Sequence, residues 1–507
     1  MRKQIQFNVI KQFEDIYSWI ILIMIFSIYY LDFVPNGNEE NYLQLAKAFY
    51  ETDWIKNSFV LSESAGTRIL YNYIVGFFLS IFSFEKVVFI FRGLFILAYS
   101  LILCKIYKSL KITNLMIVLH LVLIYLGKQS YFAGSWIFIT IEAKEFSYLF
   151  VLLALNFLIQ RKYNQTIILL VFATYFHVLI GFYAFFYMAL TILIIEKWNF
   201  KSNNRLILKL SVYFLIILPY AYILSSNIGG AADLKPSSDW IYTYFRNPHH
   251  TTLINGGFFG HLKGIIFSFF AMLSLIYMLK KDNNDKMHVL YILGIVSYAG
   301  TLLLVPLIFI DNNGTFLKFY LFRINAFSTF IFTLTLAKWL FKIIKNEYKT
   351  IVSVVIIIFA IQQIVEVGFL KYLRIESYKD YSLNEVSDFI KSNTDENAII
   401  LSLTDIGEGF RSDLDLSLTR KMERDMFVVY KFVPADLNKI HEWYKRIKIR
   451  DDIVKDINNL VAVSETYKID YVLSKKKFDN EFLILEFNNN TYFLYGIRNN
   501  ASVKELK

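Results

Sequence analysis

Apolar segments alternate with short basic loops over residues 1–373, and this alternation constrains the fold more than any other feature. The chain has 507 residues, of which 56% are hydrophobic. The runs at 17–34, 87–104 and 351–370 are each close to the ~20 residues that a helix needs to cross ~30 Å of hydrocarbon. About eleven runs qualify on this basis. Because only helices and closed barrels satisfy their backbone in lipid, the sequence predicts a mainly α, polytopic transmembrane helical bundle.

The positive charge of the chain is concentrated at the ends of these segments. The formal net charge is +11, and pairs such as Lys280 and Lys281 follow apolar runs directly. Lys and Arg gather in this way in cytoplasmic loops, so the pattern indicates a lipid bilayer as partner and no nucleic acid. Arg2 and Lys3 precede the first run with no cleavage site behind them, which predicts an uncleaved anchor and a cytoplasmic N-terminus. The single cysteine, Cys104, excludes a disulfide framework.

The positive-inside rule gives each span a direction. If the short run at 69–83 crossed the membrane, the basic cluster at 105–111 would lie outside, so we expect 69–83 to be a helix in the outer interface. The expected spans are 17–34, 87–104, 113–127, 146–160, a hairpin over 165–195 that turns near His177, 206–224, 262–280, 288–309, 318–340 and 350–370. This threading places the loops 35–86, 128–145 and 225–261 on the external side of a transmembrane domain that covers residues 1–373.

A small soluble domain is predicted over residues 376–507, where the composition changes. We expect an amphipathic helix at 383–393, strands at 398–405 and 425–432, a helix at 436–454, a helix leading into a strand over 463–475, and a hairpin over 482–497. The Asn-rich turn supports the hairpin. These elements form an α/β domain of roughly 130 residues, a normal domain size, and it lies on the extracytoplasmic side of the predicted topology.

Glu39 and Glu40 follow the first span by a few residues. A carboxylate at the external membrane surface can act as general base for a hydroxyl or bind a divalent cation. The alternative is an ordinary helix start, with Asn38 as the cap and acidic residues at the positive end of the helix dipole. The residues alone favour this alternative.

Three further polar residues lie at or near the ends of apolar segments. Glu142 and Lys144 open the span at 146–160, where ionisable side chains pair, snorkel or face a cavity. A lysine directed into a cavity suits a phosphate. His177 lies at an otherwise apolar hairpin tip, and a polar residue at that depth needs a partner, which can be structural or functional.

The external loop 225–261 contains the sequence RNPHH, with Arg246, His249 and His250. Adjacent histidines diverge on a helix and cannot chelate one metal from its face, but in a loop they can bind phosphate or position a sugar hydroxyl. Arg323 lies at the outer start of the span at 318–340. Arginine is the best bidentate partner of phosphate, so we expect a binding role for Arg323.

Lys431 belongs to a basic and aromatic set in the soluble domain, which suits contact with a sugar or a lipid headgroup and equally suits a half-buried helix. The sequence contains no P-loop, no nucleophile elbow and no dinucleotide-binding glycine pattern. This argues against a primary pump.

The layout of spans, acidic external loop and external α/β domain resembles the GT-C class of membrane glycosyltransferases. The phrase NEENYLQLAKAFYETDW is similar to the acidic motif after their first span, and FEKVVFIFRGLFILAYSLILCKIYKSL is similar to their second span. A narrower resemblance is to an uncharacterised bacterial GT-C-like membrane family. It depends on E-x-K at 142–144, RNPHH at 246–250, Arg323, and VVYKFVPADLNKIHEWYKR in the soluble domain. One departure from classical GT-C members is Asn38, where they often have Asp.

The resemblance implies a glycosyltransferase of the bacterial plasma membrane that takes its sugar from a polyprenyl-phosphate donor. The acceptor would be an envelope or surface glycan, a lipid or a protein. Glu39 or Glu40 would be catalytic and would hold a divalent cation (Mg²⁺ or Mn²⁺) if one is needed. The implied substrate-binding and phosphate-binding residues are Glu142, Lys144, His177, Arg246, His249, His250, Arg323 and Lys431. The alternatives are a transporter or flippase of lipid-linked glycans, and a non-catalytic membrane scaffold or receptor.

Overall fold

The structure, a computed structural model, describes residues 2–61, 68–132, 134–138, 140–197, 204–225, 234–251, 258–404, 414–434 and 436–498. The chain divides into two compact units. Unit 1 comprises residues 1–33, 88–223 and 242–372, and unit 2 comprises residues 34–87, 224–241 and 373–507. The predicted boundary near 373–376 therefore coincides with a boundary between units, while residues 35–86 belong to unit 2.

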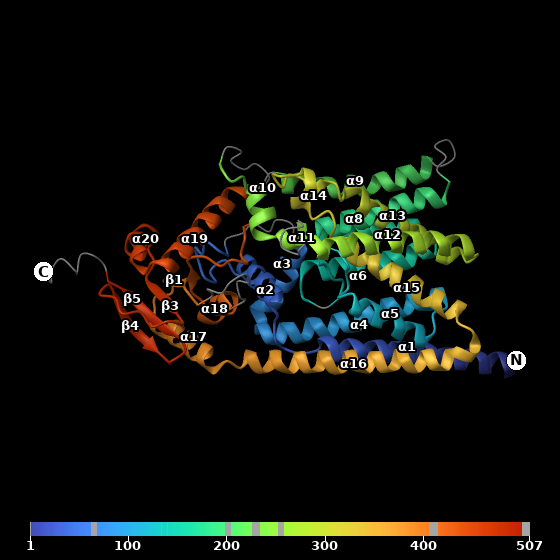
Figure 1. The fold of residues 1–507 in the computed structure, drawn as a ribbon, viewed down its shortest axis with the longest axis horizontal. Helices are drawn as coiled ribbons and strands as arrows, with labels where there is room; N and C mark the ends of the chain where they lie inside the picture. Colours follow the sequence, from blue (N-terminus) through green and yellow to red (C-terminus); the bar gives the residue numbers. More distant parts are fainter. Residues whose placement is uncertain are drawn as a thin grey trace. The chain divides into compact units, whose positions relative to one another are not determined.

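Unit 1 is a bundle of apolar helices (Figure 1). Its long helices are α1 (Arg2–Tyr30), α4 (Phe84–Leu110), α5 (Asn114–Leu126), α6 (Ala143–Ile159), α7 (Tyr163–Phe176), α8 (Val178–Ile195), α9 (Asn204–Ser225), α12 (Phe258–Lys281), α13 (Asp285–Leu304), α15 (Asn325–Ile343) and α16 (Asn346–Tyr378). Short elements complete it: a π-helical turn (Ile241–Arg246), α11 (Pro248–Thr251), α14 (Leu307–Ile310) and a 3₁₀ turn (Leu317–Phe319). Each expected span corresponds to one of the long helices, so the prediction of a polytopic helical protein is confirmed.

Within the described residues, seven helices are long and apolar enough to cross a membrane, and further apolar helices are shorter. Of the most apolar stretch of α16, only 6% is buried inside the protein. Side chains such as Ile351, Ile358 and Val365 are exposed over more than half of their surface. An apolar surface of this extent on a helix of spanning length belongs in contact with lipid tails. The chain is a multi-pass membrane protein.

Lysines connect the helix ends at one end of the bundle. Lys286 donates a hydrogen bond from Nζ to the backbone carbonyl of Ser109 over 3.2 Å, and Lys338 reaches the carbonyl of Leu110 over 2.6 Å. These lysines satisfy carbonyls that the end of α4 leaves without helical partners. The α4–α5, α12–α13 and α15–α16 junctions thus meet at one end, as expected for loops with a common basic character.

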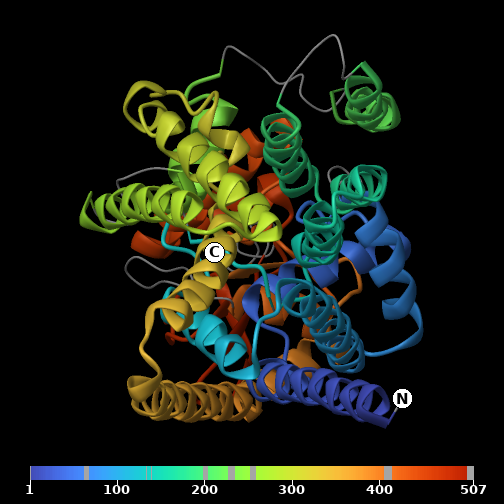
Figure 2. The same ribbon diagram turned by 90° about the vertical axis from the view of Figure 1, so that its right-hand side faces the viewer.

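The end of α1 is held in a similar way by α16, and the two helices run side by side (Figures 1 and 2). Lys371 donates from Nζ to the carbonyls of Ser27, Ile28 and Leu31. The predicted hairpin over 165–195 is also present. His177 alone separates α7 from α8, and Tyr163 at the start of α7 hydrogen bonds to Glu196 after the end of α8.

Unit 2 contains a five-stranded sheet in the order β2-β1-β3-β5-β4. The strands are β1 (Ile399–Ser402), β2 (Asp425–Met426), β3 (Tyr471–Ser474), β4 (Leu483–Asn488) and β5 (Phe493–Ile497). β1 is parallel to β2 and β3, while β5 is antiparallel to β3 and β4. The helices are α2 (Gly37–Tyr50), α3 (Ile69–Ile81), α10 (Ser238–Trp240), α17 (Tyr381–Asn393), α18 (Leu414–Met422), α19 (Leu437–Lys455), a 3₁₀ turn (Ile457–Asn459) and α20 (Leu460–Tyr467).

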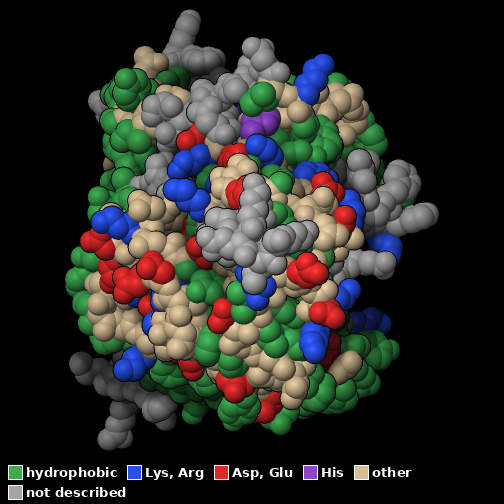
Figure 3. Space-filling view, turned by 90° about the vertical axis from the view of Figure 1, so that its left-hand side faces the viewer, with side chains coloured by type: hydrophobic (Ala, Val, Ile, Leu, Met, Phe, Trp, Pro, Cys, Tyr) green, Lys and Arg blue, Asp and Glu red, His purple; other side chains and the backbone are tan. Residues whose placement is uncertain are grey.

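The core of unit 2 unites segments from both ends of the chain. Ile400 and Leu473 of the sheet lie in one buried cluster with Leu45 of α2 and with Val60. The sequence predicts an external loop over residues 35–86, and its periodicity does not indicate that this loop completes the core of the soluble domain. On the face shown in Figure 3, acidic and basic side chains are interspersed over the surface.

The predicted strand at 425–432 is wrong beyond Met426. Phe427 still donates its N–H to the carbonyl of Ile400 over 2.9 Å, which is the last bond along this edge. The carbonyl of Val429 instead accepts a hydrogen bond from the indole N–H of Trp443 over 3.0 Å. Trp443 is fully buried. The apolar run predicts a strand, but its side chains enter the core from a loop.

Candidate functional site

A buried ionic cluster lies at the start of α6. Lys144 is 3% exposed, and its Nζ lies 3.1 Å from Glu142 Oε2 and 3.9 Å from Glu145 Oε1. Glu142 occupies the N-cap of α6 and Glu145 its first turn, where the positive end of the helix dipole favours carboxylates. Lys144 Nζ also lies 3.4 Å from the ring centroid of Trp136, so the ammonium is held by an aromatic face as well as by carboxylates.

Thr140 connects the two carboxylates. Its Oγ1 lies 2.9 Å from Glu142 Oε1 and 2.6 Å from Glu145 Oε1. The indole N–H of Trp136 donates to Thr140 Oγ1 over 3.4 Å. The second carboxylate oxygen of Glu145, Oε2, is buried and has no hydrogen-bond partner within the described residues.

A second part of the cluster centres on Arg323, in the segment before α15. Its Nη1 lies 3.3 Å from His177 Nε2, and its guanidinium lies 4.6 Å from the ring centroid of Tyr320. The hydroxyl of Tyr148, on α6, donates to the backbone carbonyl of Arg323 over 3.5 Å. His177 has a local structural role too, because its Nδ1 accepts the N–H of Ile180 and caps α8. Arg323 and Lys144 are close enough for their like charges to interact.

The RNPHH motif approaches the same cluster through Tyr320. The ring of His250 lies 5.7 Å from that of Tyr320, and the rings of His249 and His250 are 4.0 Å apart. Arg246 interacts electrostatically with Tyr320. The structure therefore brings together the candidate residues of unit 1: Glu142, Lys144, His177, Arg246, His249, His250 and Arg323.

The remaining candidates, Glu39, Glu40 and Lys431, belong to unit 2. Asn36, and not Asn38, caps α2: Asn36 Oδ1 accepts the N–H of Glu39 over 3.1 Å, and Glu39 Oε2 accepts the N–H of Asn36 over 2.8 Å. This reciprocal pair is a capping box. The cap lies two residues earlier than predicted because the reciprocal bond needs a carboxylate three residues after the cap. Lys431 Nζ lies 3.5 Å from Asn38 Oδ1.

Glu40 is held by arginine. Arg420 donates from Nε to Glu40 Oε2 over 2.8 Å and from Nη2 to Oε1 over 3.0 Å, and its Nη1 lies 3.0 Å from Glu85 Oε1. Glu40 is 2% exposed, and Ser417 donates a further hydrogen bond to it. These contacts agree with the structural interpretation of the acidic pair, although both residues are buried and not solvated.

The carboxylates of Glu39 and Glu40 accept hydrogen bonds within the described residues, and a divalent cation at this pair stays a prediction. Their oxygens accept hydrogen bonds from backbone N–H groups, a guanidinium and a hydroxyl. A cation would need several oxygen ligands with lone pairs directed at it. Across the described ranges, no group of three or more His, Cys, Asp or Glu side chains could hold a metal ion.

Sequence reasoning missed several members of the unit 1 cluster. Glu145 follows Lys144 directly and belongs to the same ionisable run, so spacing alone could have identified it. Thr140, Trp136 and Tyr320 carry no signal that separates them from their neighbours, because their roles depend on tertiary contacts.

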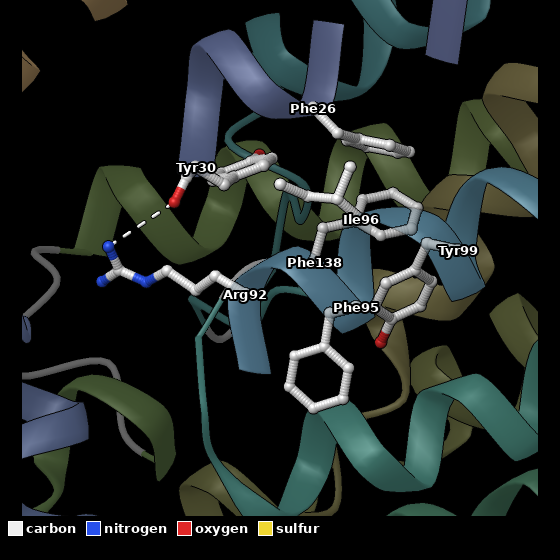
Figure 4. A pocket seen from close by; sticks show the side chains of 7 residues that line it. All are labelled: Phe26, Tyr30, Arg92, Phe95, Ile96, Tyr99 and Phe138. Atoms are coloured by element: carbon white, nitrogen blue, oxygen red, sulfur yellow. Dashed lines mark hydrogen bonds between the residues drawn. The ribbon is translucent and has the colours of Figure 1, made fainter. Parts of the chain in front are cut away.

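A buried ion pair between Asp32 and Arg92 was missed as well. Arg92 Nη1 contacts Asp32 Oδ1 over 2.5 Å, and both side chains are almost fully buried. Arg92 also donates to the carbonyl of Tyr30 over 3.5 Å at the edge of a small pocket (Figure 4). The pocket is otherwise mainly aromatic and aliphatic, and its lining residues are Phe26, Tyr30, Arg92, Phe95, Ile96, Tyr99 and Phe138. An Arg inside an apolar run and an acidic residue near the end of a span are the signals that predict such a pair.

Comparisons with known proteins identify no family. No family model matches the chain, and no curated protein matches it. Among solved structures, the chain is similar to ArnT from Cupriavidus metallidurans bound to undecaprenyl phosphate, with a TM-score of 0.42 and 9% sequence identity. The match covers 97% of this chain and 98% of the ArnT chain. A likeness at this TM-score does not establish a shared fold.

Proposed function

We propose that this protein is a membrane glycosyltransferase that transfers a sugar from a polyprenyl-phosphate donor to an acceptor hydroxyl. The single observation that supports it best is the convergence of Lys144, Arg323 and Arg246 with a pair of carboxylates in a bundle of apolar helices. The charge suits a phosphate, and the exposed apolar helices suit the lipid that carries it. The acceptor of this proposal is an envelope glycan, a lipid or a protein on the extracytoplasmic face.

The chemistry follows from the charges of the cluster. Lys144 and Arg323 would bind the donor phosphate and stabilise the negative charge that it gains as the bond to the sugar breaks. The acceptor oxygen forms the new bond to the same sugar carbon, and its proton must go to a base. In this proposal Glu142, the carboxylate nearest Lys144, receives that proton. The isoprenoid tail contributes binding free energy by burial in lipid at ~0.8 kcal/mol for each methylene.

Glu39 and Glu40 also carry a predicted catalytic role, and their contacts support a different one. Glu40 lies in a bidentate pair with the buried Arg420, so its carboxylate oxygens are already engaged within unit 2. We therefore assign Glu40 to the stability of unit 2, together with Arg420, and Glu39 to the cap of α2. Lys431 is assigned to the same unit, beside Asn38.

The test compares envelope glycans and lipid-linked sugars by mass spectrometry in cells with and without the gene. Deletion should remove a glycan product and cause its lipid-linked donor to accumulate. Lys144→Ala and Arg323→Ala should fail to restore the product, whereas Lys128→Ala should restore it. Lys128 is the matched control because it is an exposed lysine in the loop before α6. Full restoration by Lys144→Ala and Arg323→Ala at normal membrane abundance would sink the proposal and favour a non-catalytic scaffold.

A further inference from the structure

Thr140 makes short contacts with two carboxylate groups, although its hydroxyl has only one proton to donate. A threonine hydroxyl carries one proton to donate and two lone pairs to accept. Its Oγ1 lies 2.9 Å from Glu142 Oε1 and 2.6 Å from Glu145 Oε1, both within hydrogen-bond range. If both carboxylates were ionised, one of these contacts would place two lone-pair oxygens against each other. A protonated glutamate can donate to Thr140 while Thr140 donates to the other glutamate, and both contacts are then satisfied.

The contacts of Lys144 indicate which glutamate carries the proton. The distance from Nζ is 3.1 Å to Glu142 and 3.9 Å to Glu145. Glu142 has the shorter ion pair with Lys144, so the negative charge is better placed on Glu142 than on Glu145. Glu145 is fully buried, and its Oε2 has no hydrogen-bond partner among the described residues. An ionised carboxylate in that position would lack the donors that buried charge needs.

In the described part of unit 1, four titratable or charged groups face the pair of Glu142 and Glu145. The titratable or charged groups that face it are Lys144 and Tyr148 of α6, Tyr99 of α4, and Arg323 before α15. The hydroxyl of Tyr99 donates to the backbone carbonyl of Glu145 over 2.8 Å and so is not available to its side chain.

We propose that Glu142 and Glu145 share one proton through Thr140, and that this proton sets the charge that lets the cluster bind a phosphate. With the proton present, Lys144 and Arg323 face one carboxylate, and this part of the cluster has a net positive charge. Without the proton, the two carboxylates offset the charges of Lys144 and Arg323. The inference deepens the proposed function, because it assigns Glu145 and Thr140 as positioning residues of the same phosphate site.

The first experiment needs no ligand and so is independent of any transfer activity. Infrared spectra of the purified protein should contain the carbonyl band of a protonated carboxylic acid at neutral pH. Glu145→Gln should lose this band, because Glu142 is then the one remaining carboxylate and is ionised beside Lys144. Glu396→Gln, which alters an exposed acid of unit 2, is the control and should retain it. Absence of the band in the wild type, or its retention in Glu145→Gln, overturns the shared proton.

The second experiment measures binding of a polyprenyl phosphate to the protein in detergent as a function of pH. Above the pH at which the pair loses its proton, wild-type affinity should fall about tenfold for each pH unit. Glu145→Gln should keep its affinity at alkaline pH, because the amide stays neutral. Thr140→Val should shift the pH profile without abolishing binding at the acidic end. A wild-type profile that is flat, or one that Glu145→Gln leaves unchanged, contradicts the role in phosphate binding.

The two experiments separate this inference from the proposed function. If the infrared band behaves as expected and no glycan product depends on the gene, the shared proton stands and the transferase assignment fails. If the product depends on Lys144 and Arg323 but the band is absent, the transferase assignment stands and the shared proton fails.

Discussion

The two units each bury a cluster of acidic and basic side chains, and the clusters differ in how completely their charges are matched. In unit 2, Arg420 binds Glu40 through two hydrogen bonds, Glu85 through a third and the hydroxyl of Tyr378 through a fourth. The geometry is the fork that a guanidinium and a carboxylate prefer. Acid and base are thus saturated by partners inside the same unit.

The cluster of unit 1 is built from similar residues but is not saturated. One hydroxyl lies between two carboxylates, Glu145 Oε2 has no partner within the described residues, and two cations lie near each other. Unmatched buried charge is costly and persists where binding or chemistry needs it. Two clusters of similar residue types thus differ in their hydrogen-bond accounting, which supports a structural role for the cluster of unit 2 and the proposed binding role for the cluster of unit 1.

The largest expected effect is on the saturated cluster. Arg420→Ala leaves Glu40 buried without its charge partner, so we expect unit 2 to lose about 3 to 5 kcal/mol of stability. The measurement is thermal unfolding of the purified protein, followed by tryptophan fluorescence. Lys455→Ala is the control because its ion pair with Asp452 is exposed, and exposed pairs contribute little. A melting temperature for Arg420→Ala equal to that of the control would contradict the stabilising role of the Arg420 cluster.

Asp425 is expected to make a smaller contribution to stability, and this contribution depends on pH. Burial raises the pKa of Asp425 from 3.8 to about 6, against the opposing hydrogen bonds from Ser58 and the N–H of Phe59. The folded state then holds the proton more tightly than the unfolded state. The contribution to stability is greatest below pH 3.8 and is lost as the pH rises through 6, by about 3 kcal/mol in total.

Asp425→Asn should flatten this part of the stability profile. The measurement is the free energy of unfolding at a series of pH values between 4 and 7 for both proteins. Other acids contribute equally to both, so the difference isolates Asp425. Parallel profiles would contradict the assignment.

Lys144→Met tests the unsaturated cluster. Loss of a charge-assisted contact should weaken binding of a polyprenyl phosphate by about 10- to 100-fold. Stability should change much less than in Arg420→Ala, because the glutamate pair already shares one proton and Glu142 keeps its contact with Thr140. The measurements are a binding titration and thermal unfolding of the same preparation. A stability loss as large as that of Arg420→Ala would make the two clusters equivalent.

Much of the fold could be predicted from the sequence, because helix length and apolar runs are local. The spans, the hairpin turn at His177 and the hairpin of β4 and β5 all follow from short-range pattern. The recruitment of residues 34–87 into unit 2 could not be predicted, since it depends on burial of Leu45 and Val60 against strands far along the chain.

The candidate site was predictable to a similar degree. Ionisable residues at helix ends identified Lys144 and Arg323, because such residues are rare in an apolar chain. Their partners were not predictable: Thr140 and Tyr320 are ordinary loop residues until the fold brings them to the charges. Arg420 gave no signal that it would match Glu40 across 380 residues.

The smallest effect decides between the two interpretations of Glu39. Asn36→Ala removes the cap of α2 and should cost about 1 kcal/mol. Glu39→Gln should cost less, because glutamine also serves at this position of a capping box. If Glu39 is only part of the cap, Glu39→Gln keeps full transfer activity, and Asn36→Ala lowers activity only as far as it lowers the amount of folded protein. A Glu39→Gln variant that is fully stable yet makes no product would instead assign catalysis to Glu39. Mass spectrometry of the glycan product and thermal unfolding, measured on both variants, separate these outcomes because the two substitutions disturb the same capping box but only one removes the carboxylate.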